Sequence, residues 1–106
     1  NICNICWAFA RMGYGSEEFY LQMIHNLTKD FDQLNNHDLS IFVWSLEKTN
    51  NLNREVVDYC VNRIVENDIS NLKDVEVSLL LNAIVASGEG SQQFYTKISD
   101  HVKKNI

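Results

Sequence analysis

The sequence predicts an all-α fold, an α-solenoid of about three stacked antiparallel helix pairs. Proline is absent from the 106 residues, and the four glycines form two pairs that fall where turns are needed. Apolar residues recur at spacings of three and four, as they do on one face of a helix. Two separate blocks of sequence also recur every 37 to 38 residues. Such a period is typical of repeat proteins built from helix pairs.

The repeat is clearest in an aromatic block. Trp7 and Trp44 are 37 residues apart, and Asn82 follows at an interval of 38. A second block gives the same intervals, with first residues Ser16, Asn53 and Ser91. We place the extra residue of the second interval in the loop around 69–73. The chain is then one unit, 1–106, with repeats at approximately 1–35, 36–73 and 74–106.

Each repeat divides into two helices. We expect the first, helix A, over 1–12, 37–49 and 75–87, and the second, helix B, over 17–31, 54–67 and 92–105. Ser16, Asn53 and Ser91 stand one residue before each helix B, where a side-chain oxygen can accept a free backbone N–H. The turns between A and B contain Gly13-Tyr-Gly15, Asn50-Asn51 and Gly88-Glu-Gly90, which tolerate left-handed backbone.

The apolar pattern predicts how the helices are layered. Helix A is apolar almost all round, so it should be sandwiched, whereas helix B has a polar face and should form the outer layer. One such pair cannot bury its own apolar surface, and stacking of pairs gives a continuous core. Residue 1 already lies inside a helix A that carries Trp7 and Phe9. We therefore expect the chain to be a segment of a longer array.

Charge and composition narrow the function classes. Nine basic residues stand against fourteen acidic ones, for a net charge of −5. This acidity counts against a free-standing nucleic-acid binder, which is usually basic. No apolar stretch approaches the length of a membrane span, and no signal peptide is visible. We expect no membrane partner and no small-molecule substrate.

Candidate chemistry is sparse. Cys3 and Cys6 form a C-x-x-C, but it lies in the body of a predicted helix and lacks a second ligand pair, so buried thiols are favoured over a zinc or redox site. We expect Cys60 to lie in the core of a helix B. His25 and His101 are expected to face solvent. We predict no metal, no cofactor, no catalytic residue and no enzyme activity.

The sequence from Ile2 to Tyr14 contains Ile-Cys-Trp-Ala-Phe-Ala-Arg-Met-Gly-Tyr, and Glu-Glu-Phe-Tyr and an amphipathic helix follow. This pattern resembles the octotricopeptide and heptatricopeptide repeats, whose units of 37 to 38 residues carry a Trp-Ala-x-Ala-x-x-Gly core. These repeats occur in organellar RNA-metabolism proteins, commonly upstream of a RAP domain, and are related to FAST-kinase-like mitochondrial RNA factors. The resemblance covers the whole chain and weakens in the third repeat, where Asn82 replaces tryptophan.

The resemblance implies a mitochondrial RNA-binding segment without catalytic activity. In such a segment the A helices line a groove and contact single-stranded or ribosomal RNA. The helix A residues outside the core register are then the candidate contacts: Cys3, Asn4, Arg11, Ser40, Lys48 and Ser78. Small polar side chains suit base edges, and Arg11 and Lys48 suit phosphates. In the competing interpretation, the serines pack closely between helices, and the two cations interact favourably with the helix dipole in the last turn. Trp7 and Trp44 could stack on bases, but we expect them in the core between repeats.

A second function remains open. The net charge of −5 and the weakly polar third repeat also fit a protein–protein scaffold inside a large assembly, such as a mitochondrial ribosome, without direct RNA contact. The two interpretations differ in whether Arg11 and Lys48 share one surface that binds RNA.

Overall fold

The computed structural model describes residues 1–105 and contains six α-helices and no strand among them, which confirms the all-α prediction. The predicted third repeat reaches Ile106, which lies outside the described residues. The helices are α1 (Ile2–Arg11), α2 (Glu17–Thr28), α3 (Asn36–Lys48), α4 (Arg54–Glu66), α5 (Asp74–Ser87) and α6 (Gln92–Lys104), with one turn of 3-10 helix, η1 (Phe31–Gln33), between α2 and α3.

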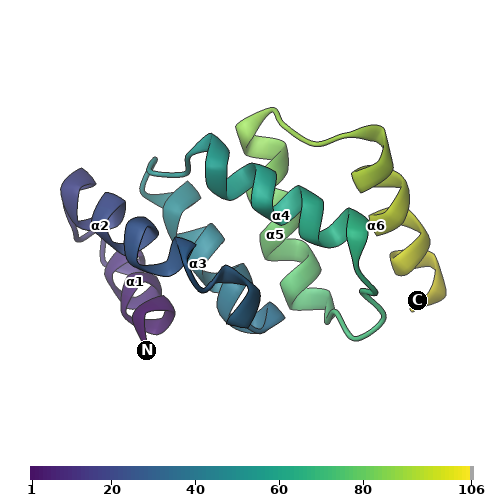
Figure 1. The fold of residues 1–106 in the computed structure, drawn as a ribbon, viewed down its shortest axis with the longest axis horizontal. Helices are drawn as coiled ribbons and strands as arrows, with labels where there is room; N and C mark the ends of the chain where they lie inside the picture. Colours follow the sequence, from purple (N-terminus) through teal and green to yellow (C-terminus); the bar gives the residue numbers. More distant parts are fainter. Residues whose placement is uncertain (106) are drawn as a thin grey trace.

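The helices follow one another along the longest dimension of a body measuring 39 × 25 × 23 Å. The helices α1, α3 and α5 run from left to right in Figure 1, with α1 packed on α3 and α3 packed on α5. The other three, α2, α4 and α6, follow in the same order, and α4 packs beside α6 and also contacts α5. Within residues 1–105, no helix combines the length and the apolar character needed to cross a membrane.

The predicted caps of the B helices are confirmed. The side chains of Ser16, Asn53 and Ser91 accept the backbone N–H three residues ahead, at distances of 3.1, 2.9 and 3.1 Å. The helices α1 and α3 use asparagine in the same way, at Asn1 and Asn35. Each cap satisfies one of the amide donors that a helix start leaves free.

The turn from helix A to helix B begins with a left-handed residue in each repeat. Gly13, Asn50 and Gly88 occupy equivalent positions and have φ angles of 69°, 61° and 74°. In the first two repeats the next residue donates its N–H back to the helix, Tyr14 to Phe9 at 2.8 Å and Asn51 to Leu46 at 2.7 Å. In the third repeat the N–H of Glu89 instead donates to the hydroxyl oxygen of Ser87 at 3.2 Å. A left-handed residue at this position is what ends an α-helix cleanly.

A tyrosine packs over the second turn glycine in the first and third repeats. The Tyr20 hydroxyl donates to the carbonyl of Tyr14 at 2.7 Å, and the Tyr95 hydroxyl donates to that of Glu89 at 3.1 Å. A Cβ on Gly15 or Gly90 would lie 2.8 Å from the tyrosine it faces. Both glycines are therefore required by this close approach as well as by their positive φ.

Two details of the prediction are wrong. The first helix B ends at Thr28 rather than at residue 31, because the chain turns there and Phe31 enters the core. The Phe31 ring lies 4.8 Å from that of Tyr59 and 6.4 Å from that of Phe42. The extra residue of the second interval is also not in the loop, because the loops 29–35 and 67–73 have equal length; α4 is one residue longer than α2.

The core runs without interruption from α1 to α6. The helix α3 contributes most to it, as expected for a helix with neighbours on both sides, and seven of its thirteen residues are buried. In α1 only Cys3, Cys6 and Ala10 are buried. The prediction that every helix A is sandwiched therefore holds for α3 and fails for α1 and α5, because each of these two has a neighbouring helix A on one side only among the described residues.

Candidate nucleic-acid interface

Arg11 and Lys48 lie on one surface. Each is the last residue of its helix, α1 or α3, and each side chain is exposed. Together they line a shallow groove of about 460 Å³ between the two A–B turns, with Thr49 and Asn50 adding polar groups. The groove therefore offers two cations to a chain of phosphates, although their place in the last turn also lets them stabilise the helix dipole.

A tryptophan lies directly beneath one of these cations. The guanidinium carbon of Arg11 is 4.6 Å from the centre of the Trp7 ring, which is within the range of a cation–π interaction. We expected Trp7 and its equivalent Trp44 to lie in the core between repeats, but both are only partly buried. Lys48 follows Trp44 by one helical turn, as Arg11 follows Trp7.

The other candidates are divided between core and surface. Cys3 and Ser40 are buried, so the prediction that they contact RNA is corrected: neither presents a surface to a ligand. The Ser40 hydroxyl donates to the carbonyl of His37 in its own helix at 2.8 Å. Asn4 is exposed on α1, and Ser78 is exposed on α5. At this aligned position only Ser78 is exposed, whereas Cys3 and Ser40 are buried. The three residues therefore form no continuous row of contacts.

The three thiols are free and buried. Burial raises the pKa of Cys3 from 9.0 to about 12, with a contribution from the carboxylate of Asp38, and burial alone raises the pKa of Cys6 to about 11. Burial also raises the pKa of Cys60 to about 12, despite the opposing charge of Arg63. Thiols with raised pKa values are poor metal ligands and poor nucleophiles at neutral pH. Among residues 1–105, no three His, Cys, Asp or Glu side chains converge as metal ligands would.

We expect the native chain to react slowly with a thiol reagent at pH 8 and all three cysteines to react rapidly once urea unfolds it. Stability should also depend on pH. Unfolded thiols release their protons near pH 9.0, whereas the folded ones hold theirs to about 11–12, so the free energy of unfolding should fall as pH rises above 9. This contribution is fully present at lower pH. Urea titrations at pH 7.5 and pH 10 measure it, and equally fast labelling of native and unfolded chains would contradict it.

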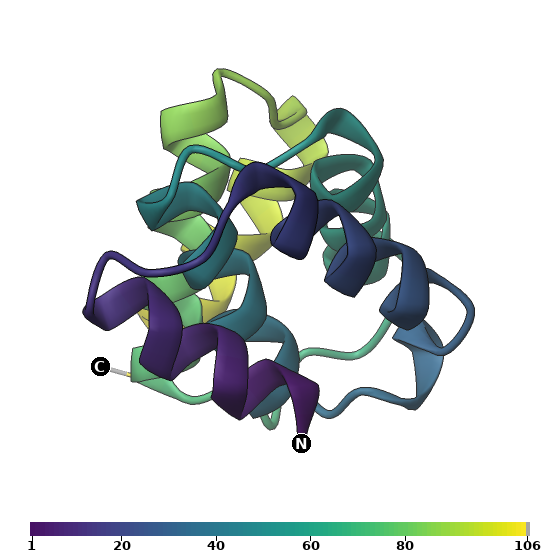
Figure 2. The ribbon, with the colours of Figure 1, turned by 90° about the vertical axis from the view of Figure 1, so that its left-hand side faces the viewer.

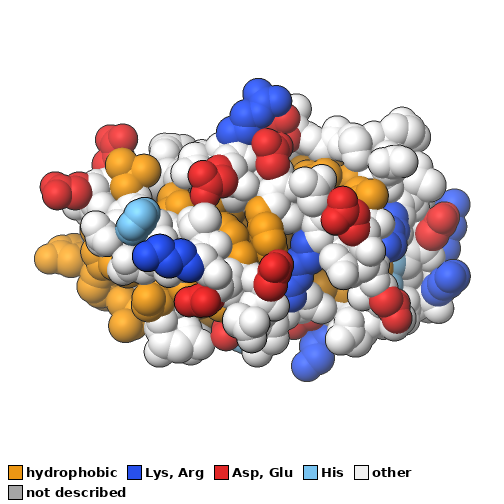
Figure 3. Space-filling view, viewed as in Figure 1, with side chains coloured by type: hydrophobic (Ala, Val, Ile, Leu, Met, Phe, Trp, Pro, Cys, Tyr) orange, Lys and Arg blue, Asp and Glu red, His pale blue; other side chains and the backbone are white. Residues whose placement is uncertain are grey.

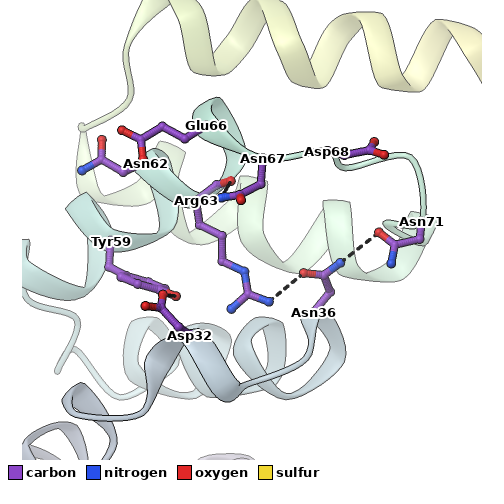
Figure 4. Close-up of a pocket in the computed structure, with 9 residues that line it drawn as sticks. All are labelled: Asp32, Asn36, Tyr59, Asn62, Arg63, Glu66, Asn67, Asp68 and Asn71. Atoms are coloured by element: carbon purple, nitrogen blue, oxygen red, sulfur yellow. Dashed lines mark hydrogen bonds between the residues drawn. The ribbon is translucent and has the colours of Figure 1, made fainter.

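A second hollow, of about 610 Å³, lies between the start of α3, the face of α4 and the loop after α4 (Figure 4). Arg63 donates to the carbonyls of Phe31 and Leu34, at 3.2 and 2.7 Å, and to the side-chain oxygen of Asn36 at 3.1 Å. The Tyr59 hydroxyl donates to Asp32 at 2.6 Å. Burial, and then this hydrogen bond to Asp32, raise the pKa of Tyr59.

These polar groups serve the fold. The donors of Arg63 are directed at the loop between α2 and α3, and no buried side-chain N or O atom among the described residues lacks a partner. Sequence reasoning did not identify Arg63. Its sequence equivalent, His101, was expected to face solvent, so the alignment gave no signal for Arg63. That expectation is wrong, because His101 is buried and its Nε2 is 2.9 Å from the carbonyl of Leu72.

Comparisons with known protein families, with characterised proteins and with solved structures find no match to this chain.

Proposed function

We propose that this chain is a segment of an α-solenoid that binds single-stranded RNA without catalysing a reaction. The observation that carries the proposal is the joint position of Arg11 and Lys48 on one groove, with the Trp7 ring beneath Arg11. Cations bind phosphates, and aromatic faces beside them stack on unpaired bases. Asn4, exposed on the same helix as Trp7, adds an amide that can bond to a base edge.

The solenoid part of the proposal draws on the packing. Helix α3 packs between α1 and α5, and equivalent turns, caps and hydrogen bonds recur in successive repeats. The resemblance to octotricopeptide and heptatricopeptide repeats adds the expectation of an organellar, mitochondrial RNA-metabolism or ribosome-associated protein. An acidic outer layer agrees with a net charge of −5, because exposed carboxylates lie on the B helices at Glu17, Glu18, Glu55, Asp58 and Glu66.

Reversing both cations should weaken RNA binding. We expect Arg11→Glu combined with Lys48→Glu to lower the affinity for a uridine-rich single-stranded oligonucleotide on the order of ten-fold or more. The slope of log affinity against log salt should become shallower by about 1.4, because two phosphate contacts are lost. Fluorescence anisotropy at several salt concentrations measures both quantities.

The matched control is Lys103→Glu with Lys104→Glu, which makes the same change in net charge at the exposed end of α6. This pair should bind RNA almost as the unaltered chain does. Equal losses in the two double variants would show that only net charge matters, and unchanged binding in the first would remove the groove from the proposal.

The second candidate function is a protein–protein scaffold within a large assembly. The observation in its favour is the apolar surface of the first repeat, where Ile5, Met12, Tyr14 and Leu21 are each exposed. Figure 3 shows hydrophobic side chains gathered at that end of the molecule. Monomeric proteins rarely expose large contiguous apolar patches. An unaltered chain that binds no RNA at low salt would favour this function.

A further inference from the structure

We propose that the open face of α1 and α2 is a docking surface for another two-helix unit, and that Gln22 and Asn26 recognise backbone carbonyls in that unit's loop. Figure 2, viewed from this end, shows the α1–α2 pair in front with no described element covering it. The inference rests on the proposed stacking of repeats, but not on RNA binding.

The exposed apolar side chains of α1 occupy positions that are buried in the other A helices. Ile5 is 49% exposed, whereas its equivalents Phe42 and Leu80 are 0% and 2% exposed. Ala8 is exposed, whereas its equivalents Ser45 and Ala83 are buried. In α3 and α5 a preceding helix A packs alongside, α1 in the first case and α3 in the second. The free side of α1 is therefore the same interface without its partner.

The B helices show the same difference at their apolar positions. Phe19 and Met23 of α2 are only partly buried. Their equivalents are fully buried in both later repeats: Val56, Cys60, Phe94 and Ile98. An incoming helix B beside α2 would therefore cover apolar surface on Phe19 and Met23, as α4 covers α6 now.

Side chains at two polar positions of helix B form hydrogen bonds to the unit that precedes them, so they indicate which groups a partner must supply. Arg63 donates to the carbonyl of Leu34, and one repeat later His101 bonds to the carbonyl of Leu72, both in the loop that precedes the repeat. At a second position Lys97 donates to the carbonyls of Val65 and Asn67, and its equivalent Tyr59 donates to the carboxylate of Asp32, also in the preceding unit. Each later helix B thus holds the end of the preceding unit through side-chain donors.

In α2 the residue equivalent to Arg63 and His101 is Asn26, and the residue equivalent to Lys97 is Gln22. Both are exposed, and the Gln22 amide donates to the Asn26 side-chain oxygen at 3.1 Å, with no loop beside them. Amide groups can donate to backbone carbonyls as the lysine and histidine do. A partner that fits this face therefore has a helix A, a helix B and the loop after helix B, in the arrangement that precedes α3 and α5.

A second copy of the chain fits this face less well than a unit with its loop. The α5–α6 end does present apolar residues, among them Val85 and Val102. The two loops that follow a helix B within the chain, 29–35 and 67–73, are already bound by Arg63 and His101 of the same chain. The continuity of the A-helix row, from α5 through α3 to α1, instead points to one more unit of the same kind.

The test adds such a unit before the first residue of the full chain. A second copy of residues 1–37 is placed directly before Asn1, which keeps the repeat spacing and puts the loop of the copy before α1. We expect the amides of the original α1 and α2 to exchange at least about ten-fold more slowly with deuterium, because end units of repeat arrays gain stability from a neighbour. The midpoint of thermal unfolding should also rise.

The matched variant carries Ile5→Glu and Ala8→Glu in the original copy. In the chain without the added unit these changes should leave the unfolding midpoint nearly unchanged, because both residues are exposed there. In the extended chain they should abolish the gain in protection. Gln22→Ala with Asn26→Ala should remove part of it.

Protection that is unchanged by the added unit, or equal with and without the glutamates, would overturn the docking surface. Loss of RNA binding by Arg11→Glu and Lys48→Glu has no bearing on this result, so failure of the two proposals can be told apart.

Discussion

Replacing Phe42 with alanine is expected to destabilise the chain by about 3–5 kcal/mol. Phe42 is fully buried in α3, the central helix of its row, and its ring lies 6.4 Å from that of Phe31. The substitution removes apolar contacts and leaves a cavity that flanking helices fill only in part. Domains of this size are stable by about 5–15 kcal/mol, so this one change removes a large share. Urea unfolding followed by circular dichroism at 222 nm measures it.

The control is Ile5→Ala, at the equivalent position of α1. Ile5 is half-exposed, so its truncation should cost less than about 1 kcal/mol. Both substitutions truncate an apolar side chain at one aligned position, and the difference comes mainly from whether a neighbouring helix A covers it. Similar costs at the two positions would mean that α1 and α3 do not differ in burial as the structure describes.

The local features of the fold were predictable because their causes are local. A cap needs one side-chain oxygen near the first free amides, and Ser16, Asn53 and Ser91 each provide it. A left-handed turn needs glycine or asparagine, as at Gly13 and Asn50. Both signals lie within a few residues of the structure they specify, so the sequence alone locates the helix starts and the turns.

Burial at an aligned position was not predictable from the repeat alone. Cys3, Ser40 and Ser78 share a register, yet only the first two are buried, since each lies in a helix with another helix A after it. Ser78 lies in α5, beyond which the described chain places no further helix A. A repeat pattern shows which residues are equivalent, but the neighbour of each helix decides which of them can meet a ligand.

The placement of Arg11 and Lys48 was partly predictable. Equivalent residues of two helices that pack side by side, as α1 and α3 do, lie close together, so their shared groove follows from the repeat. The cation–π contact with Trp7 follows from the four-residue spacing on one helix. The hydrogen bonds of Arg63 to the loop before α3 could not be foreseen, because their acceptors are backbone carbonyls 29 and 32 residues away. Such acceptors leave no pattern in the sequence.

Substituting Arg63 with methionine is therefore expected to cost about 2–4 kcal/mol. Methionine retains much of the apolar stem but donates no hydrogen bond, so the carbonyls of Phe31 and Leu34 lose a charged donor in a partly buried site. Hydrogen exchange should accelerate first in the segment from η1 to the start of α3. Urea unfolding gives the global cost, and amide exchange resolved by residue gives the local one.

Arg54→Met is the matched control on the same helix. The Arg54 side chain is 77% exposed, and its ion pairs with Asp58 and Glu89 are 3.8 and 3.9 Å long. Exposed pairs contribute little, so this change should cost less than about 1 kcal/mol. If Arg63→Met cost no more than Arg54→Met, the loop would be held by its buried Phe31 alone. A clear excess would instead establish that helix B secures the preceding unit through Arg63, which is the role that His101 repeats with a single ring nitrogen.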